Sequence, residues 1–337
     1  MAKGQGKVAA NKSRIVAKLP LACSDETAAV EFLEEQRWGE TGPCCPHCGD
    51  TDVYQMKDRK TGQRNKRFLW RCKGCGKQYT VRVGTVYEDS PIPLRHWCCA
   101  FWAACASKKG VSAKQIQRQT GLTYKSALFL MHRIRWAMTE DYSGQPKLGG
   151  IVEADETYVG GKPRNKQPGK GPQKGWLKTR KTPVVSVVQR DGQIRSFVTA
   201  DVTANNVGKI LRENVRLDSH LMTDSSPIYR FSLGKPFARH GMTDHRHGEY
   251  AKPDGTHSNT VESAFALLKR GIYGTFHNVS RKHLHRYVAE FDFRWNRRGM
   301  DDGARVASAI SNADGKRLRY REPVAKVSEG PSRGNLF

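Results

Sequence analysis

The fold of this chain is decided by the stretch Gly149-Gly150-Ile151-Val152-Glu153-Ala154-Asp155-Glu156-Thr157-Tyr158-Val159-Gly160-Gly161. Isoleucine, valine, threonine and tyrosine favour an extended backbone, and a glycine pair bounds the run at each end, so the sequence predicts a short strand. Alternation along a strand places Glu153 and Asp155 on one face and Glu156 on the other. Like charges crowded on a half-buried strand repel and need either solvent or a cation. The stretch is therefore either a solvated edge strand or the first part of a metal site, with Asp155 as its first carboxylate.

Two further acids lie in segments that can bring them to Asp155. Asp224 ends a short apolar run and is followed by turn residues, which is typical of a strand that ends at a cleft. Glu262 lies in the segment 259–270, whose apolar residues recur at helical spacing. Lys269 follows Glu262 by seven residues, on nearly the same helical face. Two aspartates at strand ends and a glutamate on a helix can converge on a pair of metal ions that act on a phosphodiester.

Two CxxC pairs form the second strong motif of the sequence. The four cysteines are Cys45, Cys48, Cys72 and Cys75, with 23 residues between the pairs. Four thiolates from two such turns make a closed tetrahedral zinc site, and this interpretation competes with a redox dithiol. Cys44 is a poorer ligand than its neighbour because it would break the CPHC spacing. The sequence therefore predicts a zinc ribbon with one structural Zn²⁺ per chain.

The composition points to a polyanion as the partner. The 337 residues include 58 Lys and Arg against 32 Asp and Glu, a formal net charge of +26. Such a charge attracts nucleic acid and steers its approach. A basic surface would also suit an anionic membrane, but the longest nearly uncharged apolar run, 97–106, is about half a bilayer span. We therefore expect double-stranded DNA as the partner, no membrane association, and cysteines that are reduced ligands rather than disulfides.

A helix-turn-helix is expected between the ribbon and the acidic strand. Segments 112–119 and 124–138 have helical patterns, Gly121 supplies the turn between them, and Thr123 can cap the second helix. The alternative is an ordinary helical hairpin. The basic residues of the second helix that could contact DNA are Lys125, His132, Arg133 and Arg135.

The segment after the acidic strand predicts a mixed α/β domain. Residues 160–181 are rich in Gly, Pro, Lys and Arg and are expected to form a mobile basic loop beside Asp155. A hairpin around Arg190-Asp191-Gly192, a helix from Thr203 and a strand that ends at Asp224 follow. In the basic loop, the candidate DNA contacts are Lys162, Arg164 and Lys166.

Taken together, these motifs resemble the DDE transposases of insertion sequences, in the group with an N-terminal zinc ribbon. The resemblance extends over roughly residues 25–300 in the right order. It implies an α/β catalytic core that is RNase H-like, a mixed sheet with flanking helices, preceded by a zinc ribbon and a helix-turn-helix. The matching pieces are CPHCG (45–49), CKGCG (72–76), DETYVGGK (155–162), TD (223–224), HSNTVE (257–262), LKR (268–270), HLHRY (283–287) and RWNRR (294–298).

The same resemblance implies roles for individual residues. Asp155, Asp224 and Glu262 correspond to the catalytic triad that binds two Mg²⁺ or Mn²⁺ ions, and Lys269 would contact a phosphate. Some relatives have Asn at the third acidic position, which makes Asn259 the alternative to Glu262. Glu153 and Glu156 share the strand with Asp155 but not its expected role.

The expected organisation and function follow. The chain is expected to be a transposase that binds the ends of its insertion sequence, cleaves DNA and transfers strands, as a homo-oligomer on DNA in the bacterial cytoplasm. The alternatives are a structure-specific nuclease without joining activity and a catalytically silent DNA-binding regulator. The expected segments are a disordered basic arm (1–24), a helix plus zinc ribbon (25–90), a helix-turn-helix region (91–140), the RNase H-like domain (148–300) and a polar tail (301–337).

Overall fold

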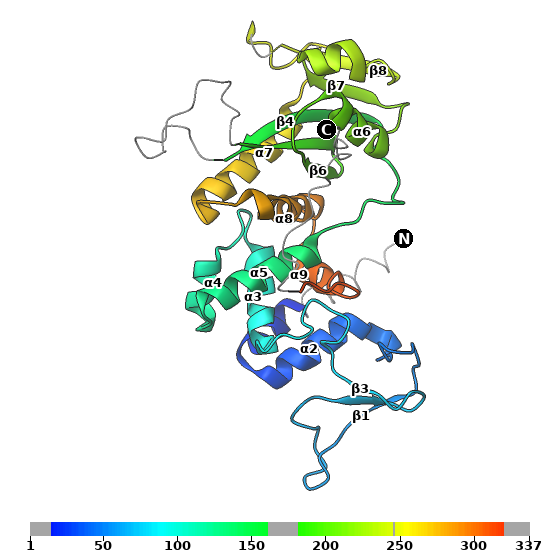
Figure 1. Ribbon diagram of the computed structural model, residues 1–337, viewed down its shortest axis with the longest axis vertical. Helices are drawn as coiled ribbons and strands as arrows, with labels where there is room; N and C mark the ends of the chain where they lie inside the picture. Colours follow the sequence, from blue (N-terminus) through cyan, green and yellow to red (C-terminus); the bar gives the residue numbers. More distant parts are fainter. Residues whose placement is uncertain (1–14, 161–180, 245–246, 320–337) are drawn as a thin grey trace, which may run out of the picture. The chain divides into compact units, whose positions relative to one another are not determined.

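The computed structural model describes residues 15–160, 181–244 and 247–319. These residues form two compact units, and Figure 1 shows their elements. The first unit runs up to Thr139 and resumes at Arg297, and the second runs from Glu140 to Asn296. No helix in the described ranges is long and apolar enough to cross a bilayer.

The first unit combines helices with a small antiparallel sheet. The sheet order is β1-β2-β3. The ribbon packs on α2, where the buried carboxylate of Glu34 accepts hydrogen bonds from Arg64 and from Trp70 Nε1 (2.8 Å). The elements are α2 (Glu26–Trp38), η1 (Gly39–Thr41), β1 (Val53–Gln55), β2 (Trp70–Cys72), β3 (Gln78–Tyr79), α3 (Leu94–Ala106), α4 (Ala113–Thr120), α5 (Tyr124–Met138) and α9 (Asp302–Ser311).

Side-chain caps define the starts of three of these helices. Asp25 accepts a hydrogen bond from Ala28 N (2.7 Å) at the start of α2. Ser112 and Thr123 cap α4 and α5 in the same way. Gly121 ends α4 with a left-handed φ of 71°, so the chain turns at once into α5. The predicted pair of helices joined by a tight turn is present.

Two predictions about the ends of the chain were wrong. Residues 15–24, expected to belong to a disordered arm, are helical, because Leu19 and Ala22 are buried. Part of the expected polar tail forms α9, in which Val306 and Ile310 are buried and which packs against α3 and α2. In each segment the buried side chains are spaced three or four residues apart and so lie on one helical face, whereas Val16 and Leu21 of the first segment are exposed.

The second unit is built on a mixed five-stranded sheet of order β6-β5-β4-β7-β8. β4 pairs antiparallel with β5 and parallel with β7, and this sheet with its flanking helices confirms the RNase H-like core. β8 was not predicted, because its sequence RHGMT lacks a clear alternation of apolar and polar residues and its conformation depends on pairing with β7. The elements are β4 (Ile151–Val159), β5 (Thr182–Gln189), β6 (Ile194–Val198), α6 (Ala204–Asn214), β7 (His220–Asp224), η3 (Tyr229–Leu233), β8 (Arg239–Thr243), α7 (Asn259–Gly271), η5 (Ile272–Phe276), η6 (Arg281–His283) and α8 (Leu284–Asn296).

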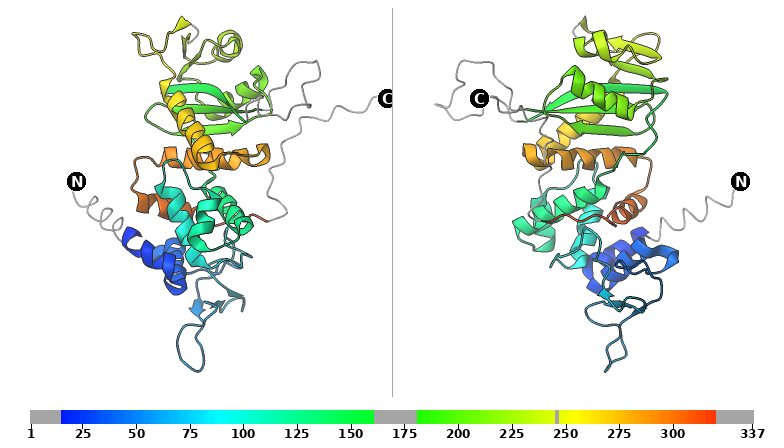
Figure 2. Two further views of the ribbon diagram at one scale, coloured as in Figure 1. Left: turned by 90° about the vertical axis from the view of Figure 1, so that its left-hand side faces the viewer. Right: turned by 45° about the vertical axis from the view of Figure 1, so that its right-hand side comes forward.

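Helices cover both faces of this sheet, and each face has its own hydrophobic core (Figure 2). On one face, Val152 and Ala154 of β4 pack against Val207 and Leu211 of α6. On the other, Val159 of β4 packs with residues of α7 and α8. The apolar face of α8 is buried, and its residues are Leu284, Tyr287, Val288 and Phe291.

The α8 face also buries a carboxylate. Asp292 accepts hydrogen bonds from Ser196 N and Ser196 Oγ of β6, each 2.7 Å long. Burial raises the pKa of Asp292 from 3.8 to about 8, the nearby Glu140 adds to this, and the two bonds from Ser196 oppose it. A protonated Asp292 can still satisfy both partners, since the Ser196 hydroxyl can accept as well as donate.

This pKa predicts a pH-dependent stability. Between about pH 4 and about pH 8 the folded chain keeps a proton on Asp292 that the unfolded chain releases, so this group lowers the free energy of unfolding as the pH rises through that window. Asp292→Asn is neutral at every pH, so urea unfolding should show a smaller loss of stability from pH 5 to pH 8 than in the wild type. Asp191→Asn on the exposed turn after β5 is the control, and an unchanged loss in Asp292→Asn would contradict the assignment.

Candidate functional site

The four cysteines of the CxxC pairs converge in the ribbon. Two Sγ–Sγ distances are 3.6 Å, Cys45 to Cys75 and Cys48 to Cys72. All four sulfur atoms lie within 4.8 Å of one another, the one such compact ligand group among the residues that the structure describes. Cys44 is exposed and outside the group, in agreement with the predicted spacing. Four soft thiolates in this arrangement are consistent with one structural zinc ion.

Asp224 lies at the carboxyl end of β7, and Asp155 lies in the middle of the adjacent parallel strand β4, just beyond the residues of β4 that pair with β7. The register of β4 with β7 pairs Glu153 with Met222, and two more residues along both strands bring Asp155 level with Asp224. Asp224 ends β7 and accepts a hydrogen bond from Ser226 N (3.0 Å), so its carboxylate is held in the turn. The carboxyl ends of parallel strands are where α/β folds place their ligands.

Glu262 enters the same region from the first turn of α7. Its Oε1 accepts a hydrogen bond from Ser258 Oγ (3.2 Å), and Ser258 is buried at the start of the helix. Asn259, the alternative third residue, is exposed, and its backbone N–H donates to His257 Nδ1 (3.3 Å). Lys269 is also exposed, two turns further along α7.

The electrostatics of Asp155 connect the three acids. Burial raises the pKa of Asp155 from 3.8 to about 8, and the negative charges of Glu156, Asp224 and Glu262 raise it further, against a hydrogen bond from Glu156 N (2.8 Å). Such a site holds a proton unless a cation compensates the charge. Carboxylate oxygens are the ligands that Mg²⁺ and Mn²⁺ prefer, so the donor set fits such an ion. The acids are near enough to interact but do not form a closed ligand group like that of the cysteines.

The other two acids of β4 have protein partners. Glu156 lies on the α6 face, as the alternation predicted, and accepts a hydrogen bond from Tyr229 Oη (2.9 Å). Glu153 lies on the α7 face with none of its side chain exposed, and it forms an ion pair with Arg190 (2.9 Å). That Glu153 does not share the role of Asp155 stays a prediction, and its buried ion pair gives it a partner within the protein. The one signal of this partner in the sequence is an arginine in the turn after β5.

The basic residues assigned to DNA have different environments. Arg133 is buried and donates from Nη1 to the carbonyl oxygens of Val86 (2.9 Å) and Glu88 (2.8 Å). Arg135 is 1% exposed. Those two guanidinium groups are thus held inside the protein rather than presented to a ligand, which corrects the sequence-based expectation for them. Lys125, in the first turn of α5, is exposed. Lys162, Arg164 and Lys166 lie outside the described residues.

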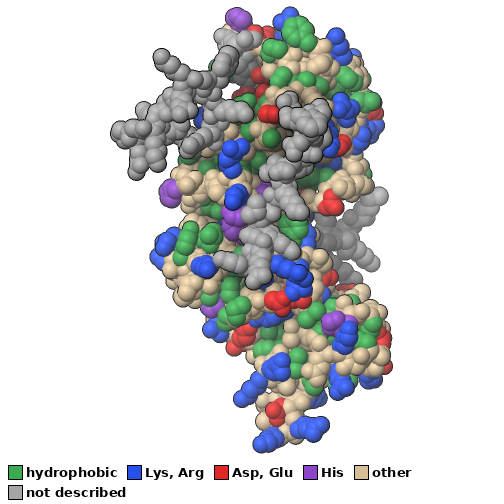
Figure 3. Space-filling model, in the orientation of Figure 1, with side chains coloured by type: hydrophobic (Ala, Val, Ile, Leu, Met, Phe, Trp, Pro, Cys, Tyr) green, Lys and Arg blue, Asp and Glu red, His purple; other side chains and the backbone are tan. Residues whose placement is uncertain are grey.

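Exposed lysines and arginines also gather on the hairpin of the ribbon (Figure 3). Arg64 is an exception, because its guanidinium group pairs with Glu34 and lies over the rings of Phe68 and Trp70. The exposed basic residues in this segment are Lys57, Arg59, Lys60, Lys66 and Arg67.

Known protein families match both the ribbon and the domain that carries the acidic strand. The transposase zinc-ribbon domain matches residues 24–78, and the ISXO2-like transposase domain matches residues 147–296. An uncharacterized protein in transposable element ISH50 of Halobacterium salinarum is 26% identical over 279 residues, which cover 80% of this chain and 90% of that protein.

Solved structures give weaker likenesses. The Mos1 strand transfer complex is 14% identical, with 57% of this chain and 73% of that chain covered and a TM-score of 0.21. A pre-cleavage Mos1 transpososome is also 14% identical, with 57% and 74% covered and a TM-score of 0.19.

The two matched domains stand in the same order as the cysteine cluster and the acidic sheet described above. The chain therefore belongs to the IS1595 family of DDE transposases with an N-terminal zinc ribbon.

Proposed function

We propose that this protein binds the ends of its own insertion sequence and catalyses metal-dependent DNA cleavage and strand transfer. The observation that carries the proposal is the approach of three acids from separate elements: half-buried Asp155 in the middle of β4, Asp224 at the end of β7 and Glu262 in the first turn of α7. Burial and the charges of the neighbouring acids raise the pKa of Asp155, in agreement with this arrangement. An acid cluster of this kind requires a cation when it is ionised. The DNA would be double-stranded, at the element ends and the target, and the active form would be a homo-oligomer acting in the cytoplasm.

Each residue has a separate role in this proposal. Asp155 and Asp224 would hold both metal ions, and Glu262 would complete the site and position one of them. Two bound Mg²⁺ or Mn²⁺ ions would polarise the phosphodiester and favour ionisation of the attacking hydroxyl group. Ser258 would keep the Glu262 carboxylate oriented, and Lys269 would contact a phosphate. Exposed lysine and arginine side chains would bind the DNA backbone.

Two other functions would use the same fold. A nuclease without joining activity would share the acids, and it differs in whether water or a 3′-hydroxyl attacks. A silent DNA-binding regulator would not need a buried acid cluster, whose charge repulsion costs stability. The acids therefore favour an enzyme, and the products of a reaction with element ends and a target plasmid separate cleavage from joining.

The first prediction of this proposal concerns the acids. Asp155→Asn, Asp224→Asn and Glu262→Gln should each lower Mg²⁺-dependent cleavage and joining at least roughly 100-fold, since each removes charge needed in the transition state. Binding to element ends should change little, because its contacts come from lysine and arginine. Asn259→Ala should have a smaller effect, and Asp201→Asn, an exposed residue before α6, is the control. Full activity of Asp155→Asn would refute the assigned role.

The second prediction concerns zinc. Wild-type protein should contain about one zinc ion per chain, and Cys72→Ser should lose it and unfold the ribbon, because zinc binding by four thiolates contributes to the folding free energy. Metal analysis of the purified full-length protein measures this. Cys44→Ser is the matched control and should retain zinc. A zinc-free wild type with all four cysteines reduced would rule the site out.

The third prediction concerns the exposed lysine of α5. The start of the second helix in a helix-turn-helix is the part that enters the DNA groove. Lys125→Ala should weaken binding to element ends and reduce the salt dependence of the binding constant by about one counterion if the residue contacts a phosphate. Lys209→Ala, an exposed lysine of α6, should leave both unchanged. Equal salt dependence in the wild type and Lys125→Ala would exclude this contact.

A further inference from the structure

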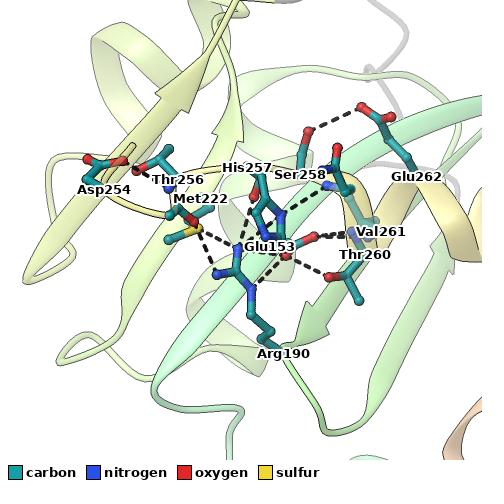
Figure 4. Close-up of polar contacts among 12 residues, drawn as sticks. Glu153, Arg190, Met222, Asp254, Thr256, His257, Ser258, Thr260, Val261 and Glu262 are labelled. Atoms are coloured by element: carbon teal, nitrogen blue, oxygen red, sulfur yellow. Dashed lines mark hydrogen bonds and ion pairs between the residues drawn. The ribbon is translucent and has the colours of Figure 1, made fainter. Parts of the chain in front are cut away.

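Glu153 makes an unusually complete set of contacts for a carboxylate two residues from Asp155 (Figure 4). Its Oε2 accepts hydrogen bonds from Thr260 N (2.8 Å) and Val261 N (3.1 Å). Its Oε1 accepts from Thr260 Oγ1 (2.8 Å) and Arg190 Nε (3.0 Å). These donors occupy the four lone-pair positions that a carboxylate offers. Glu153 therefore has no free position for a metal ion, in contrast to Asp155.

The contacts with Thr260 and Val261 cap a helix that has no side-chain cap of its own. Ser258 is the N-cap residue of α7, but its side chain makes no capping hydrogen bond and instead contacts Glu262. The first N–H groups of a helix lack partners within the helix and carry partial positive charge. Glu153 satisfies two of them with a full negative charge, from a residue more than a hundred positions earlier in the chain.

Arg190 holds the segment that leads into α7. It lies in the turn after β5, and besides its pair with Glu153 it donates from Nη1 to Gly255 O (3.2 Å) and from Nη2 to His257 O (3.3 Å). His257 Nδ1 is 3.3 Å from Glu153 Oε1. The carboxylate and its arginine thus attach the helix start, and the residues before it, to two strands of the sheet.

We propose that Glu153 is a positioning residue that fixes the start of α7 on β4 and thereby sets the place of Glu262 relative to Asp155. The inference rests on the proposed roles of those two acids. Glu262 directly follows Val261, whose backbone N–H Glu153 holds, so the carboxylate of Glu262 moves with this turn. Metal ligands must be held within about 0.5 Å of the productive geometry, and a rigid support of this kind provides that precision.

Glutamine cannot replace Glu153 in this role. Its amide offers one acceptor oxygen, and its NH₂ group would face either the two backbone N–H groups of α7 or the donors Thr260 Oγ1 and Arg190. In the first orientation the NH₂ group faces two backbone N–H donors, and in the second it faces Arg190, which cannot accept, although the Thr260 hydroxyl can turn to do so. Either orientation therefore leaves at least one donor pointing at a donor in a buried site. Thr260→Val is a milder change, because it removes only the hydroxyl donor and preserves the shape of the side chain.

The test uses the full-length protein with two measurements. In Glu153→Gln, hydrogen exchange measured without metal or DNA should become at least about tenfold faster in the first turn of α7, while exchange in α6 stays unchanged, because the loss is local. In cleavage of element ends, the Mg²⁺ concentration for half-maximal rate should rise at least tenfold, with end binding unchanged. Thr260→Val should show smaller effects in the same direction, and it supplies the test if Glu153→Gln does not fold.

Asp25→Asn is the matched control, since it neutralises another helix-capping carboxylate, that of α2. It should behave as the wild type in both measurements. Unchanged exchange at α7 in Glu153→Gln, or faster exchange across the whole unit with an unaltered Mg²⁺ requirement, would overturn the proposal in favour of a merely structural role. A wild type without metal-dependent cleavage would instead overturn the proposed function, and the exchange measurement would still decide whether Glu153 fixes α7.

Discussion

Repulsion between like charges on one buried strand is the constraint on which the catalytic unit depends. β4 carries three acids within four residues, and each has a different environment. Glu153 pairs with Arg190 and with the start of α7, and Glu156 accepts a hydrogen bond from Tyr229. Asp155 accepts a backbone N–H and keeps a pKa of about 8. Because protein groups already contact the carboxylates of its two neighbours, Asp155 is the acid on this strand whose charge a bound cation can compensate.

The order of the strands gives this arrangement its geometry. Because β4 and β7 are parallel and pair Glu153 with Met222, Asp155 and Asp224 come level with each other two residues further along. Because β5 runs antiparallel to β4, the end of β5 brings Arg190 to the start of β4, beside Glu153. Two residues of β4 thus have separate functions: Glu153 attaches α7 to the sheet, and Asp155, two residues later, is the acid that would bind metal.

The sequence predicted the features that depend on local chemistry. CxxC spacing identified the cysteine group, caps and glycines located the helix starts, and β propensity located β4. Features that depend on tertiary partners were not predictable. Arg133 has the spacing of a DNA-contacting residue, yet it donates to two carbonyl oxygens inside the protein. The partners of Glu153 lie far away in the chain, so periodicity carries no information about them.

The contrast between Glu153 and Asp155 shows why residue type alone cannot assign a role on such a strand. Both are acidic and on the same face, and both are largely removed from water. What separates them is the number of donors among the described residues: Glu153 has its lone pairs filled by four protein donors, and Asp155 accepts one backbone N–H. A carboxylate that the protein already saturates serves as a support, and one with unfilled acceptor positions and a raised pKa is suited to bind an ion. Substituting Glu153 therefore does not report on the loss of charge alone, because it also releases the helix that carries Glu262.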